Sequence, residues 1–298
     1  MPQVPKISYA SSDDPLFKMI LIRSVEGLTG QRKIEQLYHT LRRERDQRAA
    51  TKGFWGDALE KLEITLDYDE AQLVKIPQSG PVIFVANHPF GILDGLIMCH
   101  IAEKTRNEFK ILLHSHLCRE EEITPYILPI DFSETKEAAL INIESKNRAL
   151  AVLRAGGAIV IFPAGGIATT TKGPFGKATD LEWKLFTAKM IHMTQATVVP
   201  VYFPGQNGFI FQCASQVSWT LRLSLLMHEV KKKIGHTVQF IIGDPIPYQE
   251  LAPIKAKKEL LDHLRKVTYS LAPPERKKRP IRVPFKHKLP NFGGKGNV

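Results

Sequence analysis

The sequence contains little cysteine and lacks any long hydrophobic run. Only 3 cysteines occur among its 298 residues, and no CxxC pair is present, so neither a disulfide framework nor a structural zinc site is expected. A membrane-spanning helix is also not expected, because no run reaches the roughly 18 apolar residues that a span requires. The first residues, MPQVPKISYASSDD, lack the basic and apolar segments of a signal peptide. These absences favour a protein of a reducing compartment that is neither secreted nor embedded in a membrane.

Positive charge exceeds negative charge in this chain. Lysine and arginine together number 41, aspartate and glutamate number 30, and the formal net charge is +11. Such an excess favours an anionic partner, namely a nucleic acid, an anionic membrane or a phosphate-bearing substrate. Apolar residues make up 43% of the chain, which is enough for a packed core and argues against global disorder.

Residues 1–66 are predicted to form an N-terminal helical region. One helix within it places Ile34, Leu37, Tyr38 and Leu41 on a single face, which is the spacing of an amphipathic helix. Several arginines lie on its other face. The apolar face either packs on the protein core or lies in a membrane interface with the arginines on lipid headgroups. Both interpretations are open at this point.

From residue 72 onward, short β-rich runs alternate with helical stretches. This alternation predicts an α/β domain over residues 67–271, with a mostly parallel central sheet flanked by helices. Several strands are almost entirely apolar, as expected when helices cover both faces of a sheet. The predicted strands are Val82–Ala86, Lys110–Leu113, Ile127–Ile130, Ala158–Phe162, Thr197–Phe203 and Val238–Ile242. The predicted helices span residues 94–104, 135–155, 181–193, 217–234 and 254–271.

Residues 272–298 are predicted to form a flexible basic tail. Proline, glycine, lysine and arginine dominate it, and it includes the run ERKKRP. The tail has too little apolar surface to fold alone. It is either a solvated end or a strap for anionic lipid or nucleic acid.

The motif NHPFGILDG, residues 87–95, follows directly on the apolar run PVIFVA. In a parallel sheet, ligands bind at the carboxyl ends of the strands, where His88 would lie. Pro89 and Gly91 would make a tight turn, and this turn would bring Asp94, at the start of the next helix, to His88. A carboxylate that orients an imidazole is the arrangement of general-base catalysis.

A glycine pair ends a second apolar strand in IVIFPAGGIATT, residues 159–170. Gly165 and Gly166 would let backbone amides approach an anion or an oxyanion closely. The nearby TKGPFGKAT, residues 171–179, resembles a phosphate-binding loop, but it lacks the first glycine and the final Ser or Thr. It also does not directly follow a strand, so a nucleotide hydrolase is not supported.

A third segment, KILLHSHLCRE, spans residues 110–120. His114 and His116 would face one side of a strand, but too few further ligands can be placed for a metal site, so both are interpreted as structural. Arg119, a planar cation just beyond a strand end, would suit a phosphate or a carboxylate. No GxSxG nucleophile elbow occurs, so direct attack by a substrate hydroxyl is simpler than an acyl-enzyme.

These three segments, in this order, resemble the glycerolipid (lysophospholipid) acyltransferase superfamily. That family has a His–Asp block after a strand, a second block with an Arg, a Phe-Pro-Glu-Gly block and a Val-Pro block. Its fourth block corresponds here to TVVPVYFPGQNG, residues 197–208, and the later GDPIP resembles the family's ending. The resemblance covers most of the chain.

Two positions depart from the family pattern. Five residues separate His88 from Asp94, where the family usually has four, and this spacing is similar to that of a bacterial branch with hemolysin-like and lyso-ornithine lipid acyltransferases. Ala164 stands where the third block of the family has Glu, and no Arg follows. The second departure argues against lysophosphatidic acid as the acceptor and favours a lysolipid with another headgroup.

The resemblance implies an O-acyltransferase that moves a fatty acyl group from acyl-CoA or acyl-carrier protein to the hydroxyl of a lysolipid, which is a lysophospholipid or a lyso-ornithine lipid. His88 would be the general base, and Asp94 would orient it. No metal and no cofactor is implied. The expected location is the cytoplasmic face of the inner membrane, bound peripherally to its anionic surface. The implied substrate-binding residues are Asn87, Phe90, Gly91, Arg119, Phe162, Pro163, Gly165, Gly166 and Pro200.

Two other functions are compatible with the same residues. One is a non-catalytic basic protein that uses this fold to bind lipid or nucleic acid. Nucleic acid is the weaker partner, because few aromatic residues interleave with the basic runs. The other is an acyl thioesterase, in which water replaces the lipid hydroxyl.

Overall fold

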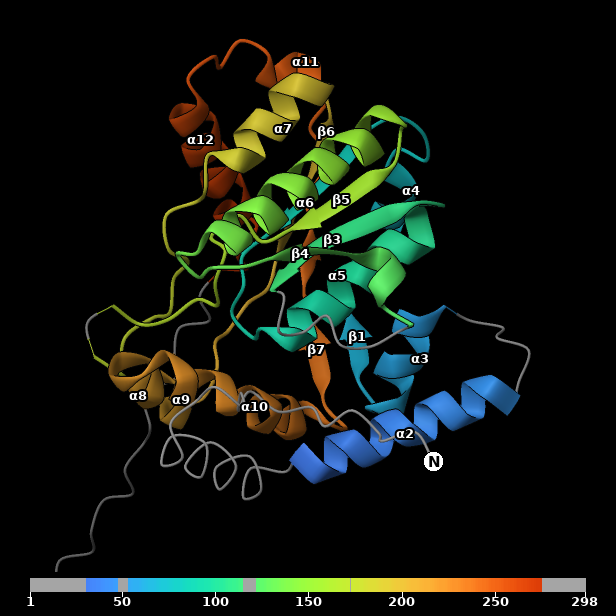
Figure 1. Ribbon diagram of the computed structural model, residues 1–298, viewed down its shortest axis with the longest axis vertical. Coiled ribbons are helices and arrows are strands. Elements are labelled where there is room, and N and C mark those ends of the chain that lie inside the picture. The colour runs from blue at the N-terminus through green and yellow to red at the C-terminus, as the bar shows by residue number, and fades with distance from the viewer. Residues whose placement is uncertain (1–30, 48–52, 115–121, 172, 275–298) are drawn as a thin grey trace, which may run out of the picture.

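The computed structural model describes residues 31–47, 53–114, 122–171 and 173–274. A six-stranded sheet forms its centre (Figure 1). Five of the strands run parallel, and the last pairs antiparallel at one edge. The predicted α/β fold with a mostly parallel sheet is therefore confirmed. From one edge to the other, the strands are β4 (Ile127–Ile130), β3 (Phe109–His114), β5 (Ala158–Ile161), β2 (Val82–Ala86), β6 (Thr197–Tyr202) and β8 (Ile241–Ile242).

The prediction of one strand at Val238–Ile242 is wrong. The segment forms β7 (Thr237–Gln239) and β8, which belong to different sheets. β7 pairs in parallel with β1 (Thr65–Asp67) in a separate two-stranded sheet. The chain changes partner at Phe240, whose side chain is buried. The predicted boundary at residue 66 lies inside β1, and the division of the chain into domains stays a prediction.

Helices cover both faces of the central sheet, which explains why its strands are so apolar. Along β2, successive side chains point to opposite faces. Val82, Phe84 and Ala86 join one core with α5 (Ile92–Thr105) and α3 (Phe54–Lys61). Ile83 and Val85 join a second core on the other face. The helices of that second face are α6 (Lys136–Arg154), α7 (Phe186–Thr194) and α12 (Lys257–Ser270).

The helix predicted at residues 217–234 is two helices. The chain turns at Ser218, whose hydroxyl accepts a hydrogen bond from the Leu221 amide at 3.4 Å, and breaks again at Leu225. Helix α7 begins five residues later than predicted because the chain before it forms a loop. The remaining helical elements are α4 (Ala71–Lys75), η2 (Thr124–Tyr126), α8 (Phe209–Val217), α9 (Trp219–Ser224), α10 (Leu226–Lys233) and α11 (Tyr248–Leu251).

Helix α2 (Gln31–Gln47) packs its apolar face on the protein core. Leu41 is buried, and Leu37 and Tyr38 are partly buried against the same core. Arg45 on this helix forms an ion pair with Asp57 of α3. The described part of α2 thus packs its apolar face on the core, and membrane association of the N-terminal region stays a prediction. Residues 15–30 and the tail beyond residue 274 lie outside the described residues, and no described helix is long and apolar enough to cross a membrane.

Asn87 ties the end of β2 to the end of β6. Its side-chain amide donates to the Phe203 carbonyl at 2.9 Å, and its side-chain oxygen accepts from the Phe203 amide at 2.7 Å. Both polar groups of Asn87 are used, and the residue is buried. This pair holds the carboxyl ends of two neighbouring strands together.

Replacing Asn87 by alanine would leave the buried amide and carbonyl of Phe203 without partners. We expect Asn87→Ala to lower the free energy of unfolding by about 1–3 kcal/mol, the usual penalty for such groups. Urea denaturation of the purified variant measures this loss. An unchanged stability would show that water or another side chain replaces the lost hydrogen bonds.

Candidate active site

The turn after β2 brings the side chains of His88 and Asp94 together. Gly91, the residue before α5, has a φ of +78°, and a side chain there would also collide with Ile167. Asp94 is the third residue of α5. Its Oδ2 lies 3.1 Å from the Nδ1 of His88. The contact that the sequence predicts is thus present, and it depends on a turn that only glycine accommodates easily.

One oxygen of Asp94 collects three hydrogen-bond donors. Besides the His88 ring, Oδ2 accepts from the backbone amides of Phe90 at 2.8 Å and Gly91 at 3.0 Å. Asp94 is fully buried, and this burial raises the pKa of its carboxyl, while His88 and the two amides oppose the shift. The carboxylate is therefore fixed in position before any ligand binds.

The His88 ring is contacted on its face by Phe162 and at its Nδ1 edge by Asp94. It stacks on Phe162 with ring centroids 3.8 Å apart and planes 25° from parallel. Since Nδ1 faces Asp94, the free edge of the ring carries Nε2, and no described residue hydrogen-bonds to that nitrogen. A carboxylate at Nδ1 favours the tautomer in which Nε2 is unprotonated and can accept a proton.

Asp180 is a second buried carboxylate at His88, and sequence reasoning missed it. Its side chain accepts from the His88 backbone amide at 3.1 Å and from the Trp183 indole at 3.0 Å. Helix α12 holds the same residue, because Tyr269 accepts from the Asp180 amide and Arg265 donates to its carbonyl. Burial raises the pKa of Asp180. No local motif reveals this contact, since the two partners lie 92 positions apart in the sequence.

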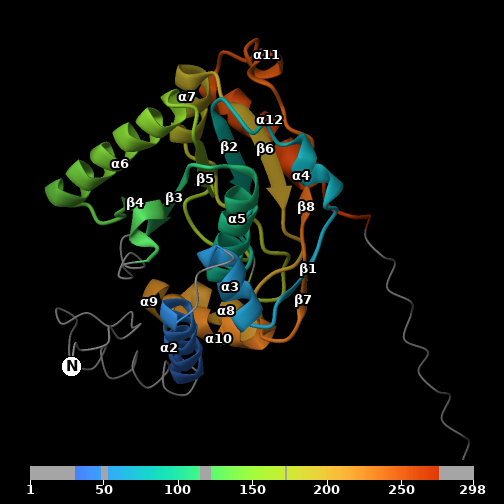
Figure 2. The same cartoon turned by 90° about the vertical axis from the view of Figure 1, so that its right-hand side faces the viewer.

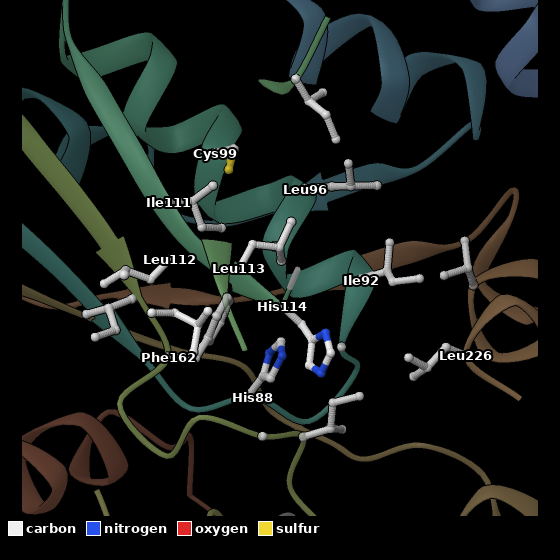
Figure 3. Close-up of a pocket in the computed structure, with 18 of the residues that line it drawn as sticks. His88, Ile92, Leu96, Cys99, Ile111, Leu112, Leu113, His114, Phe162 and Leu226 are labelled. Atoms are coloured by element: carbon white, nitrogen blue, oxygen red, sulfur yellow. The ribbon is translucent and has the colours of Figure 1, made fainter. Parts of the chain in front are cut away.

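His88 lies at a large apolar cavity of about 660 Å³. Figure 3 shows its ring beside Phe162, near apolar side chains that project from α5 and β3. Further lining comes from α2, α3 and α10, so the amphipathic face of α2 forms part of the cavity wall. Such an enclosed apolar volume suits an aliphatic chain.

Five of the predicted binding residues line this cavity, and three do not. Phe90 is buried in the core and contributes its backbone amide to Asp94. Pro200 is buried within β6, and Asn87 is used by Phe203. Arg119 lies outside the described residues. The five that line the cavity are Gly91, Phe162, Pro163, Gly165 and Gly166.

Four cationic side chains that line the cavity were not predicted, namely Lys61, Lys146, Lys184 and Arg222. Lys184 and Lys146 both line it, and neither forms an ion pair with a described residue. A side chain at Gly165 would lie 3.9 Å from the Cε of Lys184, which places this lysine beside the glycine pair. Lys146 lies over the ring of Phe186. In contrast, Ala164, at the position of the family's Glu, is buried in the core of the sheet. No metal-binding cluster of His, Cys, Asp or Glu occurs among the described residues.

Comparisons with known proteins find two curated relatives and a similar solved structure. The chain is 29% identical over 231 residues to the lyso-glycine lipid O-acyltransferase of Phocaeicola vulgatus, covering 70% of this chain and 77% of that protein. It is 25% identical over 231 residues to the protein of the same name from Bacteroides thetaiotaomicron, covering 70% and 79%. The crystal structure of the 1-acyl-sn-glycerophosphate acyltransferase PlsC from Thermotoga maritima aligns over 86% of this chain and 87% of that one, with 15% identity and a TM-score of 0.48.

The family assignment rests on a family model that matches more than half of the chain. The model of the acyltransferase family matches residues 54–274. This range includes the His88–Asp94 turn, the loop with Gly165 and Gly166, and most of the cavity wall. The resemblance drawn from the sequence motifs is thereby confirmed, and this chain belongs to the acyltransferase family.

Proposed function

We propose that this protein is an O-acyltransferase that moves a fatty acyl group from a thioester to the hydroxyl of a lysolipid. The observation that carries the proposal is the contact of His88 with the buried Asp94 at a large apolar cavity. The His88–Asp94 pair supplies a base for a hydroxyl group, and the apolar cavity supplies a compartment for a fatty chain. The names of the two curated relatives, lyso-glycine lipid O-acyltransferases, support acyl transfer to a lysolipid.

The proposed reaction proceeds by direct transfer. The Nε2 of His88 accepts the proton of the acceptor hydroxyl while its oxygen attacks the thioester carbonyl. The tetrahedral intermediate then expels the thiolate, which takes the proton back from the imidazolium. Asp94 stays ionised and stabilises the imidazolium in between. The products are the acylated lipid and the free thiol of the donor, and the step requires neither a metal nor a cofactor.

An acyl-enzyme on cysteine is less compatible with the structure. Cys99 lines the cavity, but its thiol is fully buried, and burial raises its pKa well above the ordinary value. The thiolate is the nucleophilic form of cysteine, so this environment disfavours attack by Cys99. Direct attack by the lipid hydroxyl avoids that difficulty.

We propose an amino-acid lysolipid of the glycine type as the acceptor. Both curated relatives carry the name of lyso-glycine lipid O-acyltransferase, and the position of the family's Glu is a core alanine here. Lys184, beside Gly165, would bind the acidic headgroup. The donor would be acyl-CoA or acyl-carrier protein, and the enzyme would act peripherally on the cytoplasmic face of the inner membrane.

Replacing His88 by alanine removes the proposed base. We expect His88→Ala to lower the rate of acyl transfer by about 10²-fold or more, the scale of lost general-base catalysis, while circular dichroism stays unchanged. His192→Ala is the matched control, because His192 lies outside the cavity and contacts Tyr248. Equal rates for His88→Ala and His192→Ala would contradict the proposed role.

Release of the acyl group in the absence of a lipid acceptor separates transfer from hydrolysis. We expect thiol release from the acyl donor to require the lysolipid, because the bound hydroxyl is the proposed nucleophile. Thiol release can be followed colorimetrically with and without acceptor. Equally fast release in both cases would identify a thioesterase.

Replacing Lys184 by alanine removes the proposed headgroup contact. We expect Lys184→Ala to raise the KM for an acidic lysolipid by about tenfold, since a hydrogen bond to a charged group contributes roughly 1.5–3 kcal/mol. Lys189→Ala on the following helix, α7, is the control, because Lys189 is exposed and does not line the cavity. An unchanged KM for Lys184→Ala would remove this residue from the headgroup site.

A further inference from the structure

Helix α8 (Phe209–Val217) has apolar side chains on its exposed face as well as on its buried face. Phe211 and Ala214 are buried in a small core of their own. Exposed apolar side chains lie elsewhere on the helix, and the ring of Phe175 contacts that of Phe209 at a centroid distance of 4.9 Å. We define the α8 patch as the four side chains that are 51% to 87% exposed, which are Phe175, Phe209, Ile210 and Val217.

Three of the four residues of the α8 patch lie in a stretch without charge, whereas Phe175 lies two residues before Lys177. No Asp, Glu, Lys or Arg occurs between residues 205 and 221, although such residues make up 24% of the chain. The two glutamines of the helix point to the protein rather than to the patch. Gln212 accepts from the Thr170 amide at 3.1 Å, and Gln216 donates to the Thr170 carbonyl at 2.7 Å. The exposed face is therefore apolar and is fixed to the loop that follows β5.

The α8 patch adjoins the substrate cavity. The buried face of α8 shares a core with Ile167 and Leu226, and both of these residues line the cavity. One helix, with a diameter of about 10 Å including side chains, separates the patch from the cavity wall. Figures 1 and 2 show α8, α9, α10 and α2 together at one end of the molecule.

Exposed cations lie on the helices at this same end. Lys231 and Lys232 on α10 and Arg43 on α2 are exposed. Lys232 also lies beside Gly208, the residue before α8, and pairs there with Glu229 at 2.8 Å, so Lys231 and Arg43 are the cations that would meet lipid headgroups. Apolar side chains flanked by cations complement the surface of an anionic bilayer, because the side chains enter the acyl boundary while the cations meet the headgroups.

We infer that the α8 patch inserts into an anionic lipid surface and thereby holds the cavity against the bilayer that contains the acceptor. The inference rests on the proposed function, because a lysolipid substrate comes from a membrane. A bilayer fits better than a protein groove, since exposed cations lie on the helices at the same end of the molecule and none of the four patch members carries a hydrogen-bonding side chain. A second copy of this chain is the competing occupant.

Binding to vesicles of phosphatidylcholine with anionic phosphatidylglycerol tests the inference. We expect the double variant Phe175→Ser/Phe209→Ser to bind about tenfold or more weakly in a flotation assay, because burial of even one such side chain has this scale. The matched control is Leu140→Ser/Ile143→Ser on α6, since these side chains are 67% and 54% exposed at another place in the fold. Thermal unfolding of both variants checks that the fold is kept.

Two readouts separate this inference from the proposed function. With a lysolipid and donor presented in detergent micelles, the patch variant should transfer at the wild-type rate, whereas on vesicles its rate should fall in parallel with binding. Unchanged vesicle binding by the patch variant overturns the inference even if the enzyme is active. A wild-type dimer in sedimentation that the patch variant converts to a monomer, with lipid binding unaffected, identifies the second copy as the occupant and also overturns it.

Discussion

The site depends on one buried carboxylate oxygen. The Oδ2 of Asp94 accepts from the His88 ring and from two consecutive backbone amides, so the side chain, the turn and the imidazole are fixed by the same atom. A carboxylate in an apolar interior is tolerated when hydrogen bonds compensate for its lost hydration. Here Oδ2 receives all three of them, while the buried Oδ1 has no partner among the described residues. In the proposed mechanism these hydrogen bonds also orient the general base, so the contacts that stabilise the turn are the ones that prepare the proposed chemistry.

The rest of the fold supplies the surroundings of that oxygen. The parallel sheet places the end of β2 beside the loop after β5, where Phe162 stacks on His88. Asp180, in a loop distant in the sequence, accepts a hydrogen bond from the His88 backbone amide. Helix α12 positions Asp180, because Arg265 donates to its carbonyl. On the other side, α2, α3, α5 and α10 enclose an apolar volume. A rigid polar pair beside a chain-sized apolar compartment is the arrangement that an acyl transfer to a lipid needs.

Local patterns in the sequence predicted the parts of the structure that local forces determine. β2 and β4 have the predicted bounds because each is a short apolar run between breaking residues. The contact of His88 with Asp94 was predictable because only five residues, including the glycine of the turn, separate the two side chains in the sequence. The same reasoning could not find Asp180 or Lys184, which reach the site only through tertiary packing. It also placed Asn87 in the binding site, although the pairing of β2 with β6 directs its amide to Phe203.

The tautomer of His88 is the most direct test of the central claim. Nitrogen-15 NMR of the protein, labelled in its histidine rings, distinguishes a protonated from an unprotonated ring nitrogen at neutral pH. The account predicts a proton on Nδ1 and none on Nε2 in the wild type, and a loss of this preference in Asp94→Asn. A wild-type ring with its proton on Nε2, or a preference that survives in Asp94→Asn, would contradict the claim that Asp94 prepares His88 as the base.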